Sequence, residues 1–325
     1  MIQKIYNNLS KNLIWYTLLM IIMGIILGHF WDLKFLSNYM IIIIFIMIYP
    51  MMVNLSLSAL KRVKETIKPL SEALIINFIY APLFLWFLCS LFIPDPKIKL
   101  AIMLLSIAPA SSMGIGYIGL AAGDVLAGTI IVASAFILSI FVYPIAGQYF
   151  ASGANIPVPL ILILKSLLMI LVLPLVLGII TREYIQRKHG AEKFLKIKPY
   201  FATITLFFLY ILIFSIFASK SDLILKDYVD ILLLLPIVIL YYGITILLVL
   251  FINKKILKFD YRENQAVVFT SVVKNIALTI AILVAVFGKE GQYLAVFPAM
   301  MALFQSPLLM TYLKFSDKIK MWFEK

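Results

Sequence analysis

Long uninterrupted runs of hydrophobic residues follow one another from one end of the sequence to the other. Each run has about 18 to 25 residues, the length that an α-helix needs to cross about 30 Å of hydrocarbon. Strands of a membrane barrel would alternate hydrophobic and polar positions, and stretches such as YMIIIIFIMIYPMM do not alternate. The pattern therefore predicts an all-α membrane protein with ten transmembrane helices. The ten runs lie near residues 13–30, 39–58, 70–93, 99–122, 125–149, 157–181, 199–219, 230–253, 264–288 and 291–313.

The overall composition supports this prediction. Of the 325 residues, 64% are hydrophobic and 13% are charged, and the mean hydropathy is +1.07. Soluble domains do not have this composition, so they are excluded. Lys4 and Lys11 precede the first run as they would in a signal peptide, but no small-residue cleavage site follows. We therefore interpret the first run as a transmembrane helix.

The positive charges lie mainly on one side of the predicted helices. The formal net charge is +13. If the N-terminus is cytoplasmic, twenty Lys and Arg residues fall in cytoplasmic tails and loops, and six fall on the opposite side. Cytoplasmic loops of membrane proteins carry such an excess. The charge thus predicts a multi-pass protein of the plasma membrane with both termini in the cytoplasm, and it does not indicate binding to nucleic acid.

Two runs carry clusters of polar, Gly or Pro residues at mid-span. The fourth contains SIAPASSMGIGYIG at 106–119, and the ninth contains FTSVVKNIALT at 269–279. Pro109 removes a backbone donor and clashes with the preceding turn, and Gly114 and Gly116 weaken a helix, so we expect a helix break in the fourth run. A second interpretation is that these small residues allow close helix packing.

The linker at 151–159 leaves five runs on each side, so the second half enters the membrane from the opposite face. Transporters with inverted repeats have this arrangement, and their sites form near the midplane where broken helices from both halves meet. We predict two inverted five-helix repeats, 1–150 and 151–325, within one membrane domain. Helices four and nine are predicted to be broken and to cross. The break in helix nine is inferred only from symmetry and from its polar residues.

Lys274 and Asn275 lie in the middle of the ninth run, where a charged side chain costs roughly 3 to more than 10 kcal/mol. A protonated Lys274 beside the N-termini of broken helices would bind an anion. Since burial disfavours the charged form, the lysine could also bind and release a proton during transport. The alternative is that its side chain snorkels to the membrane surface. Lys165, the other lysine inside a run, either contributes to the pathway, or packs between helices or snorkels from a lipid-facing position. Glu72 and Asp124, the acids nearest to the runs, fall near the predicted cytoplasmic interface.

Residue patterns for catalysis or metal binding are missing from the sequence. Cys89 is the only cysteine, and His29 and His189 have no ligand partners at metal-binding spacing. A membrane enzyme would need paired carboxylates, a Ser-His arrangement or a His-Glu metal motif inside the bilayer, and we find none. We therefore expect no enzymatic activity, no metal and no cofactor. A non-transporting membrane sensor remains an alternative from another functional class, although no segment is long enough for a soluble signalling domain.

Three segments have a distinctive residue pattern: IMIYPMMVNLSLSALKRV at 46–63, NFIYAP at 77–82 and APASSMGIGYIGLAAGD at 108–124. The first resembles the Tyr-Pro stretch that closes helix two of arsenite permeases. The second resembles the helix-three segment whose amide residue lines the site in bile acid:sodium symporters and arsenite permeases. The third resembles the arsenite-permease pattern that runs from Ala-Pro to Gly-Asp. The chain thus resembles the superfamily of these two groups, which implies ten helices in panel and core subdomains and secondary transport by alternating access.

The same resemblance implies which ligands are missing. The functional cysteine that follows the proline in arsenite permeases falls on Ala110, and their helix-nine glutamate falls on Ala277. An ammonium group repels sodium, which needs oxygen ligands, so Lys274 is expected to stand in the place of a sodium ion. The sodium ligands of the symporters fall here on Gly114, Ile115, Thr270 and Lys274.

Together these observations predict a sodium-independent secondary transporter of a small anionic solute such as an organic carboxylate. It would be either a uniporter or coupled to protons through Lys274. Export of arsenite or a related metalloid is the alternative. The expected partners are the small anion and membrane lipid, with the chain as a monomer or homodimer. The predicted site comprises Asn77, Ser111, Ser112, Met113, Thr270, Ser271, Lys274, Asn275 and Gln305.

Overall fold

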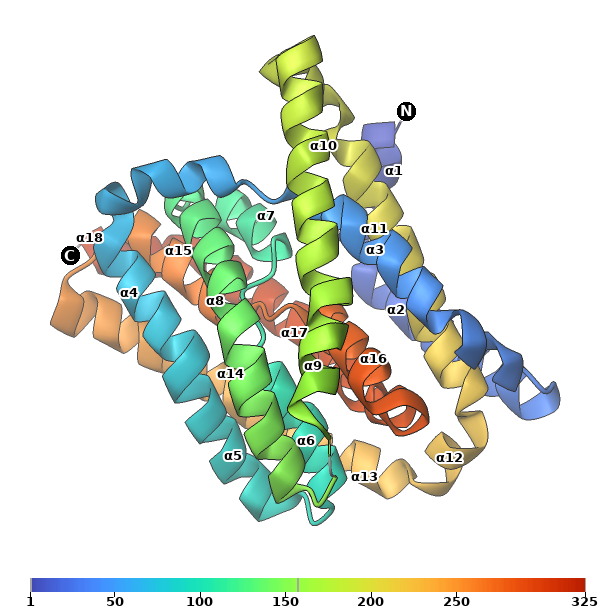
Figure 1. Cartoon of the computed structure of the whole chain (residues 1–325). Helices are drawn as coiled ribbons and strands as arrows, with labels where there is room; N and C mark the ends of the chain where they lie inside the picture. Colours follow the sequence, from blue (N-terminus) through green and yellow to red (C-terminus); the bar gives the residue numbers. More distant parts are fainter. Residues whose placement is uncertain (1, 157, 325) are drawn as a thin grey trace. The chain divides into compact units, whose positions relative to one another are not determined.

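The computed structural model describes residues 2–156 and 158–324 and is built from helices (Figure 1). No β-strand occurs in these two ranges, and nine of their helices are long and apolar enough to cross a membrane. The all-α membrane fold predicted from the hydrophobic runs is therefore confirmed. The fourth run is not among the nine, because it is divided into two short helices.

The chain forms two compact units, and each is assembled from segments of both halves of the sequence. Unit 1 comprises Met1–Leu55, Pro157–Val229 and Ala277–Ala299. Unit 2 comprises Ser56–Ile156, Asp230–Ile276 and Met300–Lys325. The inverted five-helix repeats stay a prediction.

Unit 1 is organised around the long helix α11 (Ala191–Ser219), which packs against α2 (Leu13–Phe30) and α3 (Met40–Asn54) (Figure 1). The contact between α2 and α11 is close enough to require glycine, because a Cβ atom at Gly28 would lie 2.1 Å from the carbonyl oxygen of Ala218. The other helical elements of this unit are α1 (Ile2–Lys11), η1 (Lys34–Tyr39), α9 (Leu160–Leu167), η4 (Leu168–Val172), α10 (Leu173–His189), α12 (Ser221–Lys226) and most of α16 (Ile276–Leu294).

Unit 2 contains the described residues of the predicted site. Helix α4 (Ile67–Ile75) continues through the π-helix η3 (Ile76–Tyr80) into α5 (Ala81–Phe92), and it packs against α15 (Tyr261–Val272) and α8 (Val125–Gly153). The other elements of this unit are η2 (Leu57–Thr66), α6 (Pro96–Ser106), α7 (Met113–Leu120), α14 (Leu234–Phe251), η5 (Ile252–Leu257), most of α17 (Val296–Lys314) and α18 (Ser316–Glu324). Helix α13 (Tyr228–Leu232) spans the boundary between the two units.

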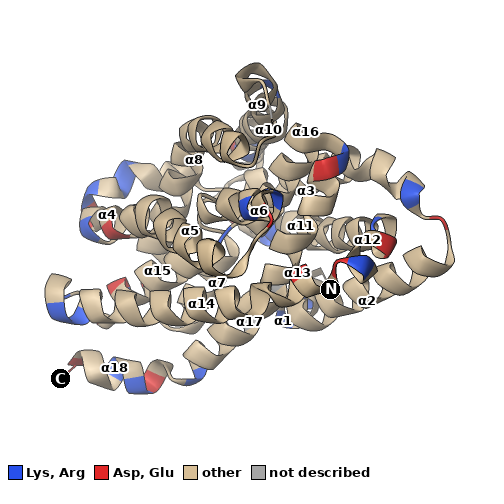
Figure 2. Ribbon diagram, turned by 90° about the horizontal axis from the view of Figure 1, so that it is seen from below, with Lys and Arg blue, Asp and Glu red and all other residues tan. Residues whose placement is uncertain are grey.

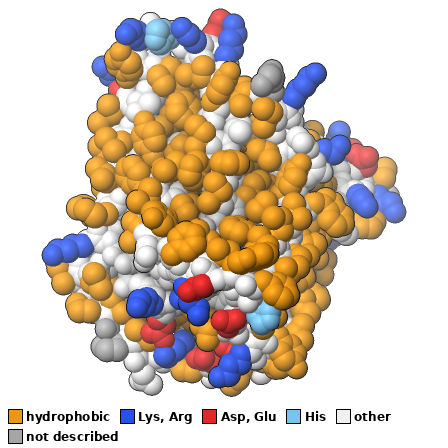
Figure 3. All heavy atoms as spheres, turned by 90° about the vertical axis from the view of Figure 1, so that its right-hand side faces the viewer, with side chains coloured by type: hydrophobic (Ala, Val, Ile, Leu, Met, Phe, Trp, Pro, Cys, Tyr) orange, Lys and Arg blue, Asp and Glu red, His pale blue; other side chains and the backbone are white. Residues whose placement is uncertain are grey.

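The exposed surface is hydrophobic, as expected for a protein whose solvent is lipid. Figure 3 shows one face covered by hydrophobic side chains, with charged side chains gathered above and below them. On α2 the exposed large side chains include Trp15, Leu19, Ile22 and Ile26. The ribbon of α5 and α14 carries no charged residue, whereas the η2–α4 corner and α18 carry several (Figure 2). A soluble protein would not expose this much contiguous apolar surface.

Candidate functional site

The fourth hydrophobic run is interrupted around Pro109. Helix α6 ends at Ser106, and α7 begins at Met113, so residues 107–112 are not helical. The proline removes a donor that a continuous helix would need. Gly114 and Gly116, which we predicted to help break the helix, lie within α7 instead. Gly114 allows α7 to approach α15, because a Cβ atom there would lie 3.2 Å from the carbonyl oxygen of Phe269, whereas a Cβ atom at Gly116 would meet nothing within 4 Å.

The ninth run is interrupted as well, although its centre contains neither Pro nor Gly. Helix α15 ends at Val272, α16 begins at Ile276, and residues 273–275 are not helical. The two breaks pair with each other through an isolated antiparallel bridge between Ala110 and Lys274. We call the paired segments 107–112 and 273–275 the crossing.

Two backbone hydrogen bonds join the segments of the crossing. The backbone N–H of Ser111 donates to the carbonyl oxygen of Val273 at 2.7 Å, and that of Asn275 donates to the carbonyl oxygen of Pro109 at 2.9 Å. Backbone groups in a membrane need partners within the protein. Each broken helix therefore supplies the partners that the other has lost.

The ammonium group of Lys274 lies at the centre of unit 2, and the residue is only 2% exposed. Its Nζ donates to the side-chain oxygen of Asn77 at 2.8 Å and to the carbonyl oxygens of Ser106 at 2.9 Å, Asn77 at 3.1 Å and Ala108 at 3.4 Å. No Asp or Glu of the described ranges forms an ion pair with it. The ammonium group is thus solvated by neutral protein oxygens, and its charge is not cancelled.

Asn77 holds this arrangement in place from the π-helix η3. Its side-chain nitrogen donates to the carbonyl oxygens of Ala73 at 2.8 Å and Thr270 at 3.0 Å, so the amide links α4 to α15. Both of its oxygens accept from Lys274. The residue is fully buried. A π-helical turn inside an α-helix often marks a functional position, and here it presents a backbone and a side-chain oxygen to the same ammonium group.

The Lys274 ammonium group contacts the C-terminal end of one of the broken helices. Ser106 is the last residue of α6, and its carbonyl oxygen belongs to the group that no helical N–H can satisfy. The C-terminal end of a helix carries partial negative charge and favours a cation. The Lys274 side chain therefore caps the C-terminus of α6, while its backbone lies two residues before the N-terminus of α16. Binding of an anion at the N-termini of the broken helices stays a prediction.

The structure brings some of the other predicted site residues to the crossing and directs their side chains elsewhere. The Thr270 hydroxyl donates to the carbonyl oxygen of Ala266 at 2.6 Å, within its own helix. The side-chain oxygen of Ser111 accepts from the N–H of Met113 at 3.3 Å, and Ser112 and Met113 are half-buried. The Ser271 hydroxyl is buried and forms no hydrogen bond within the described residues.

Gln305 and Lys165 do not join the Lys274 cluster. The side-chain oxygen of Gln305 in α17 accepts from the Tyr242 hydroxyl at 3.0 Å. Lys165 lies in α9 of unit 1 and is exposed. The two lysines inside hydrophobic runs thus have opposite environments.

The carbonyl groups of Ser106 and Ala108 bind the Lys274 ammonium group, and neither was predicted as its partner. The signal that could have found them is Pro109. A proline after a helical run leaves carbonyl oxygens upstream without donors. In a membrane these oxygens have to find a donor elsewhere, and Lys274 was the obvious candidate.

The end of α7 is tied to the start of α15. The Tyr261 hydroxyl donates to the carbonyl oxygen of Ala121 at 2.9 Å. The backbone N–H of Asp124 donates to the carbonyl oxygen of Arg262 at 3.0 Å, while the Asp124 carboxylate caps α8. The Gly-Asp motif at the end of the fourth run therefore has a structural role, fixing α7 against α15 at the end remote from Lys274.

Comparison with known proteins agrees with this architecture. Over 98% of the chain and 91% of its relative, the sequence is 24% identical to an uncharacterized transporter from Synechocystis sp.. It is also similar to two proteins named arsenical-resistance protein Acr3. The protein from Corynebacterium glutamicum is 24% identical to this chain, over 76% of this chain and 69% of the relative. The protein from Alkaliphilus metalliredigens is 23% identical, over 90% of this chain and 85% of the relative. Residues 40–227 match the family described as the Sodium Bile acid symporter family. This match covers more than half of the chain, which therefore belongs to the Sodium Bile acid symporter family of membrane transporters.

Proposed function

We propose that this protein is a sodium-independent secondary transporter of a small anionic solute, such as an organic carboxylate, and that it works by alternating access around the crossing. The observation that carries the proposal is the Lys274 ammonium group, which is buried and held by neutral oxygens only. It places an ammonium group in unit 2 at the point where both helices are broken.

This charge makes sodium an unfavourable ligand at the crossing. Two unit charges about 5 Å apart interact by about 3 kcal/mol at the effective dielectric constant typical of proteins. For a sodium ion the interaction with Lys274 is repulsive, and for a carboxylate it is attractive by the same amount. The oxygens that would have to coordinate sodium already accept from the lysine. In this proposal the ammonium group of Lys274 supplies the positive charge that a bound cation would supply.

In this proposal the solute does not need a direct hydrogen bond to Lys274. The ammonium group has three N–H donors, and four protein oxygens share them. The charge acts on the anion through space, while polar groups at the crossing contact it. Ser111, Ser112, Met113, Ser271 and Asn275 are the nearest candidates by position, and Thr270 supplies the carbonyl group that orients Asn77.

Coupling to protons through Lys274 is the variant of this proposal that the contacts favour least. Loss of a proton from Nζ would remove one of the N–H donors shared by the surrounding buried oxygens, and would leave an acceptor without a hydrogen bond. A charged lysine throughout the cycle corresponds to a uniporter, or to a transporter whose proton is carried by another group. We further propose that the protein lies in the plasma membrane with both termini in the cytoplasm, as a monomer or homodimer.

Arsenite export is the second candidate function, and the two relatives named arsenical-resistance protein Acr3 favour it. Its difficulty lies in the chemistry of the crossing. Ala110, at the position that resembles the functional cysteine of arsenite permeases, forms the bridge to Lys274 and offers no thiol. An arsenite exporter on this chain would have to bind a neutral metalloid beside a fixed ammonium group.

Ligand-induced thermal stabilisation of the purified protein tests both functions. The protein is heated with short monocarboxylates, dicarboxylates, arsenite or sodium chloride, using choline chloride as the ionic-strength control. We expect stabilisation by at least one carboxylate in the wild type and in Lys165→Met, and its loss in Lys274→Met. Stabilisation by sodium over choline would overturn sodium independence, and stabilisation by arsenite alone would establish the second candidate.

A further inference from the structure

A second buried ionisable group lies in unit 2, at the opposite end of the contact between α4 and α15. Glu72 on α4 is 8% exposed. No Lys, Arg or His in the described parts of the chain forms an ion pair with it, and no group of three metal-ligating side chains occurs there. A carboxylate that is buried without a cation has to be protonated or solvated by neutral donors.

Two fully buried amides and a tyrosine continue from this carboxyl group. One amide atom of Asn253, in η5, lies 2.6 Å from Oε1 and 2.5 Å from Oε2 of Glu72. The other amide atom of Asn253 lies 2.9 Å from the side chain of Asn264 in α15. Asn264 in turn lies 3.5 Å from the hydroxyl of Tyr312 in α17. We call these four residues the Glu72 chain.

The Glu72 chain has two self-consistent hydrogen-bond directions. In one, the carboxyl group is protonated and donates to the Asn253 oxygen, while the Asn253 nitrogen donates to Asn264 and Asn264 donates to Tyr312. Rotating both amides by 180° reverses every bond. The Asn253 nitrogen then donates to an ionised Glu72, and Tyr312 donates to Asn264. An amide can serve in either direction because it carries both an acceptor and donors.

The distances fit a proton better than a metal ion. A separation of 2.5 to 2.6 Å falls in the range of O–H···O hydrogen bonds and below the usual range of N–H···O bonds. It also leaves no room for a cation between the carboxyl group and the amide. A single carboxyl proton can bridge only one of these two contacts, whereas the two hydrogens of an amide nitrogen can bridge both, so the geometry is compatible with either direction of the Glu72 chain.

Gln265 provides a further polar group beside the chain. It is fully buried, and neither of its amide atoms forms a hydrogen bond in the described residues. The hydroxyls of Tyr261 and Tyr312 are close enough to interact with it. An amide beside the Tyr312 end of the Glu72 chain can accept or donate a hydrogen bond when that end reverses.

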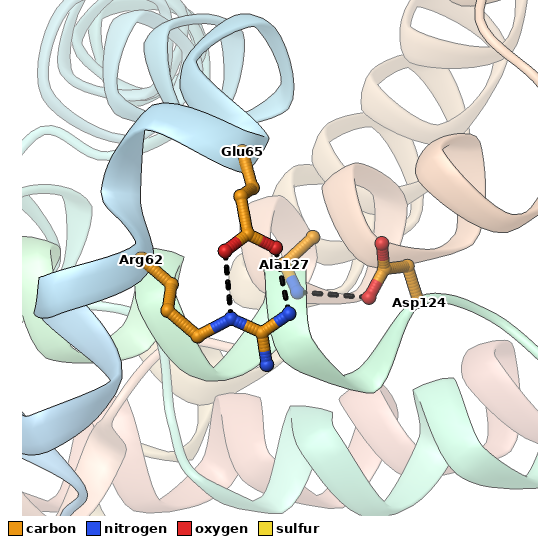
Figure 4. Close-up of polar contacts among 4 residues, drawn as sticks. All are labelled: Arg62, Glu65, Asp124 and Ala127. Carbon is orange, nitrogen blue, oxygen red and sulfur yellow. Dashed lines mark hydrogen bonds and ion pairs between the residues drawn. The ribbon is translucent and has the colours of Figure 1, made fainter.

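The charged groups on neighbouring elements are exposed or already have partners. Arg62 and Glu65 form a two-point ion pair at 2.6 and 2.7 Å, and Asp124 accepts from the N–H of Ala127 at 3.0 Å (Figure 4). Lys254 donates to the carbonyl oxygen of Phe323. The remaining ionisable groups on these elements are Lys61, Lys64, Lys68, Tyr143, Tyr149, Lys255, Asp260, Tyr261, Arg262 and Glu263. None of these cations neutralises Glu72.

The two buried groups are connected through α4. The carbonyl oxygen of Ala73, the residue after Glu72, accepts from the Asn77 amide, and the Asn77 oxygens accept from Lys274. Asn264 and Val272, the last residue of α15 before the crossing, are separated by eight residues, which is about 12 Å in a helix. A change of charge at Glu72 therefore acts on the same two helices that hold the lysine.

We propose that Glu72 is the proton-binding group of this transporter, and that the Glu72 chain reverses its hydrogen bonds each time the proton binds or leaves. The role of Glu72 in the transport cycle rests on the proposed transport function. Binding of a proton by Glu72 is independent of that function. Lys274 keeps its charge, and the coupled proton resides on Glu72.

Infrared difference spectroscopy tests proton binding without any solute. The carbonyl stretching band of a protonated carboxyl group is recorded in acidic and alkaline buffer for the wild type, Glu72→Gln and the control Glu65→Gln. We expect a band that disappears on alkalinisation in the wild type and in E65Q and is lost in E72Q. Asn253→Leu should shift the pH at which it disappears. A wild-type band identical to that of E72Q would overturn the proposal, as would a sodium-dependent change in the band in place of a pH-dependent one.

Transport in proteoliposomes tests the link to the cycle. Uptake of the same carboxylate panel is measured with and without an inward proton gradient. We expect the gradient to accelerate uptake by the wild type and by the control E65Q, and to leave the uptake rate of E72Q unchanged. An accelerated E72Q would refute coupling through Glu72. Lack of all uptake by the wild type, with the infrared result intact, would instead count against carboxylate transport and leave proton binding established.

Discussion

Replacing Lys274 by methionine tests whether its ammonium group stabilises the crossing. Methionine keeps an unbranched side chain of similar volume but has no N–H donor. In Lys274→Met the oxygens of Asn77 and the carbonyl oxygens of Ser106 and Ala108 lose the donor that they share. Their remaining surroundings are buried, so water cannot replace it without opening the helix packing.

The magnitude follows from the two shortest contacts, at 2.8 Å and 2.9 Å. Leaving a buried acceptor without a donor costs about 1 to 3 kcal/mol. Part of this loss is offset, because the variant no longer has to bury a charge. We expect a net loss of about 2 to 4 kcal/mol, which corresponds to a decrease of roughly 3 to 6 °C in the melting temperature of a chain of this length.

The assay is thermal unfolding of the purified protein in detergent, followed by intrinsic fluorescence, with Lys165→Met as the matched control. Lys165 is exposed, so its replacement should leave the melting temperature within about 2 °C of the wild type, as for surface substitutions in general. Equally small changes in melting temperature for both variants would refute the reasoning, because they would show that the hydrogen bonds of Lys274 stabilise the fold no more than those of an exposed lysine.

Three further predictions test the geometry of the crossing. Lys274→Ser removes the ammonium group and leaves its oxygens facing a cavity, so we expect sodium chloride, but not choline chloride, to raise the melting temperature of this variant and not that of the wild type. Asn77→Asp places a carboxylate 2.8 Å from Nζ and cancels the charge of Lys274. This variant should fold and should lose the stabilisation by carboxylates. Retention of that stabilisation would contradict the electrostatic role of Lys274. Gly114→Val should lower the melting temperature, because even a Cβ atom at this position would lie 3.2 Å from the carbonyl oxygen of Phe269. Gly116→Ala should raise the free energy of unfolding by about 0.5 to 1 kcal/mol, because nothing lies within 4 Å of the added Cβ atom and alanine favours a helix. The opposite order of the two glycine variants would show that α7 does not approach α15 as described.

The helices could be predicted from the sequence because hydrocarbon thickness dictates their length. The break at Pro109 followed from covalent chemistry, since a proline lacks the donor that a helix requires. The break at 273–275 has no such local cause. It forms because its backbone groups find partners in the first break, an interaction between residues far apart in sequence. Symmetry predicted the second break where local propensity could not.

The environment of Lys274 was only partly predictable. Its position within a hydrophobic run indicated a functional or structural constraint, but the partners depend on how α4 packs against α15. The π-helical turn that presents both oxygens of Asn77 is not visible in the sequence NFIYAP. The pairing of Glu72 with Asn253 likewise depends on how η5 ends α14, which no periodicity reveals.

The bond between Lys274 and its acceptors also has a consequence for biosynthesis. Its donor is separated from Ser106 by 168 residues and from Asn77 by 197 residues. While the ribosome is still translating the later part of the message, the nascent chain already contains the unpaired carbonyl groups beside Pro109. These carbonyl groups lack their donor until Lys274 has been synthesised and inserted. A chain that ends before residue 274 would leave these carbonyl groups without their donor.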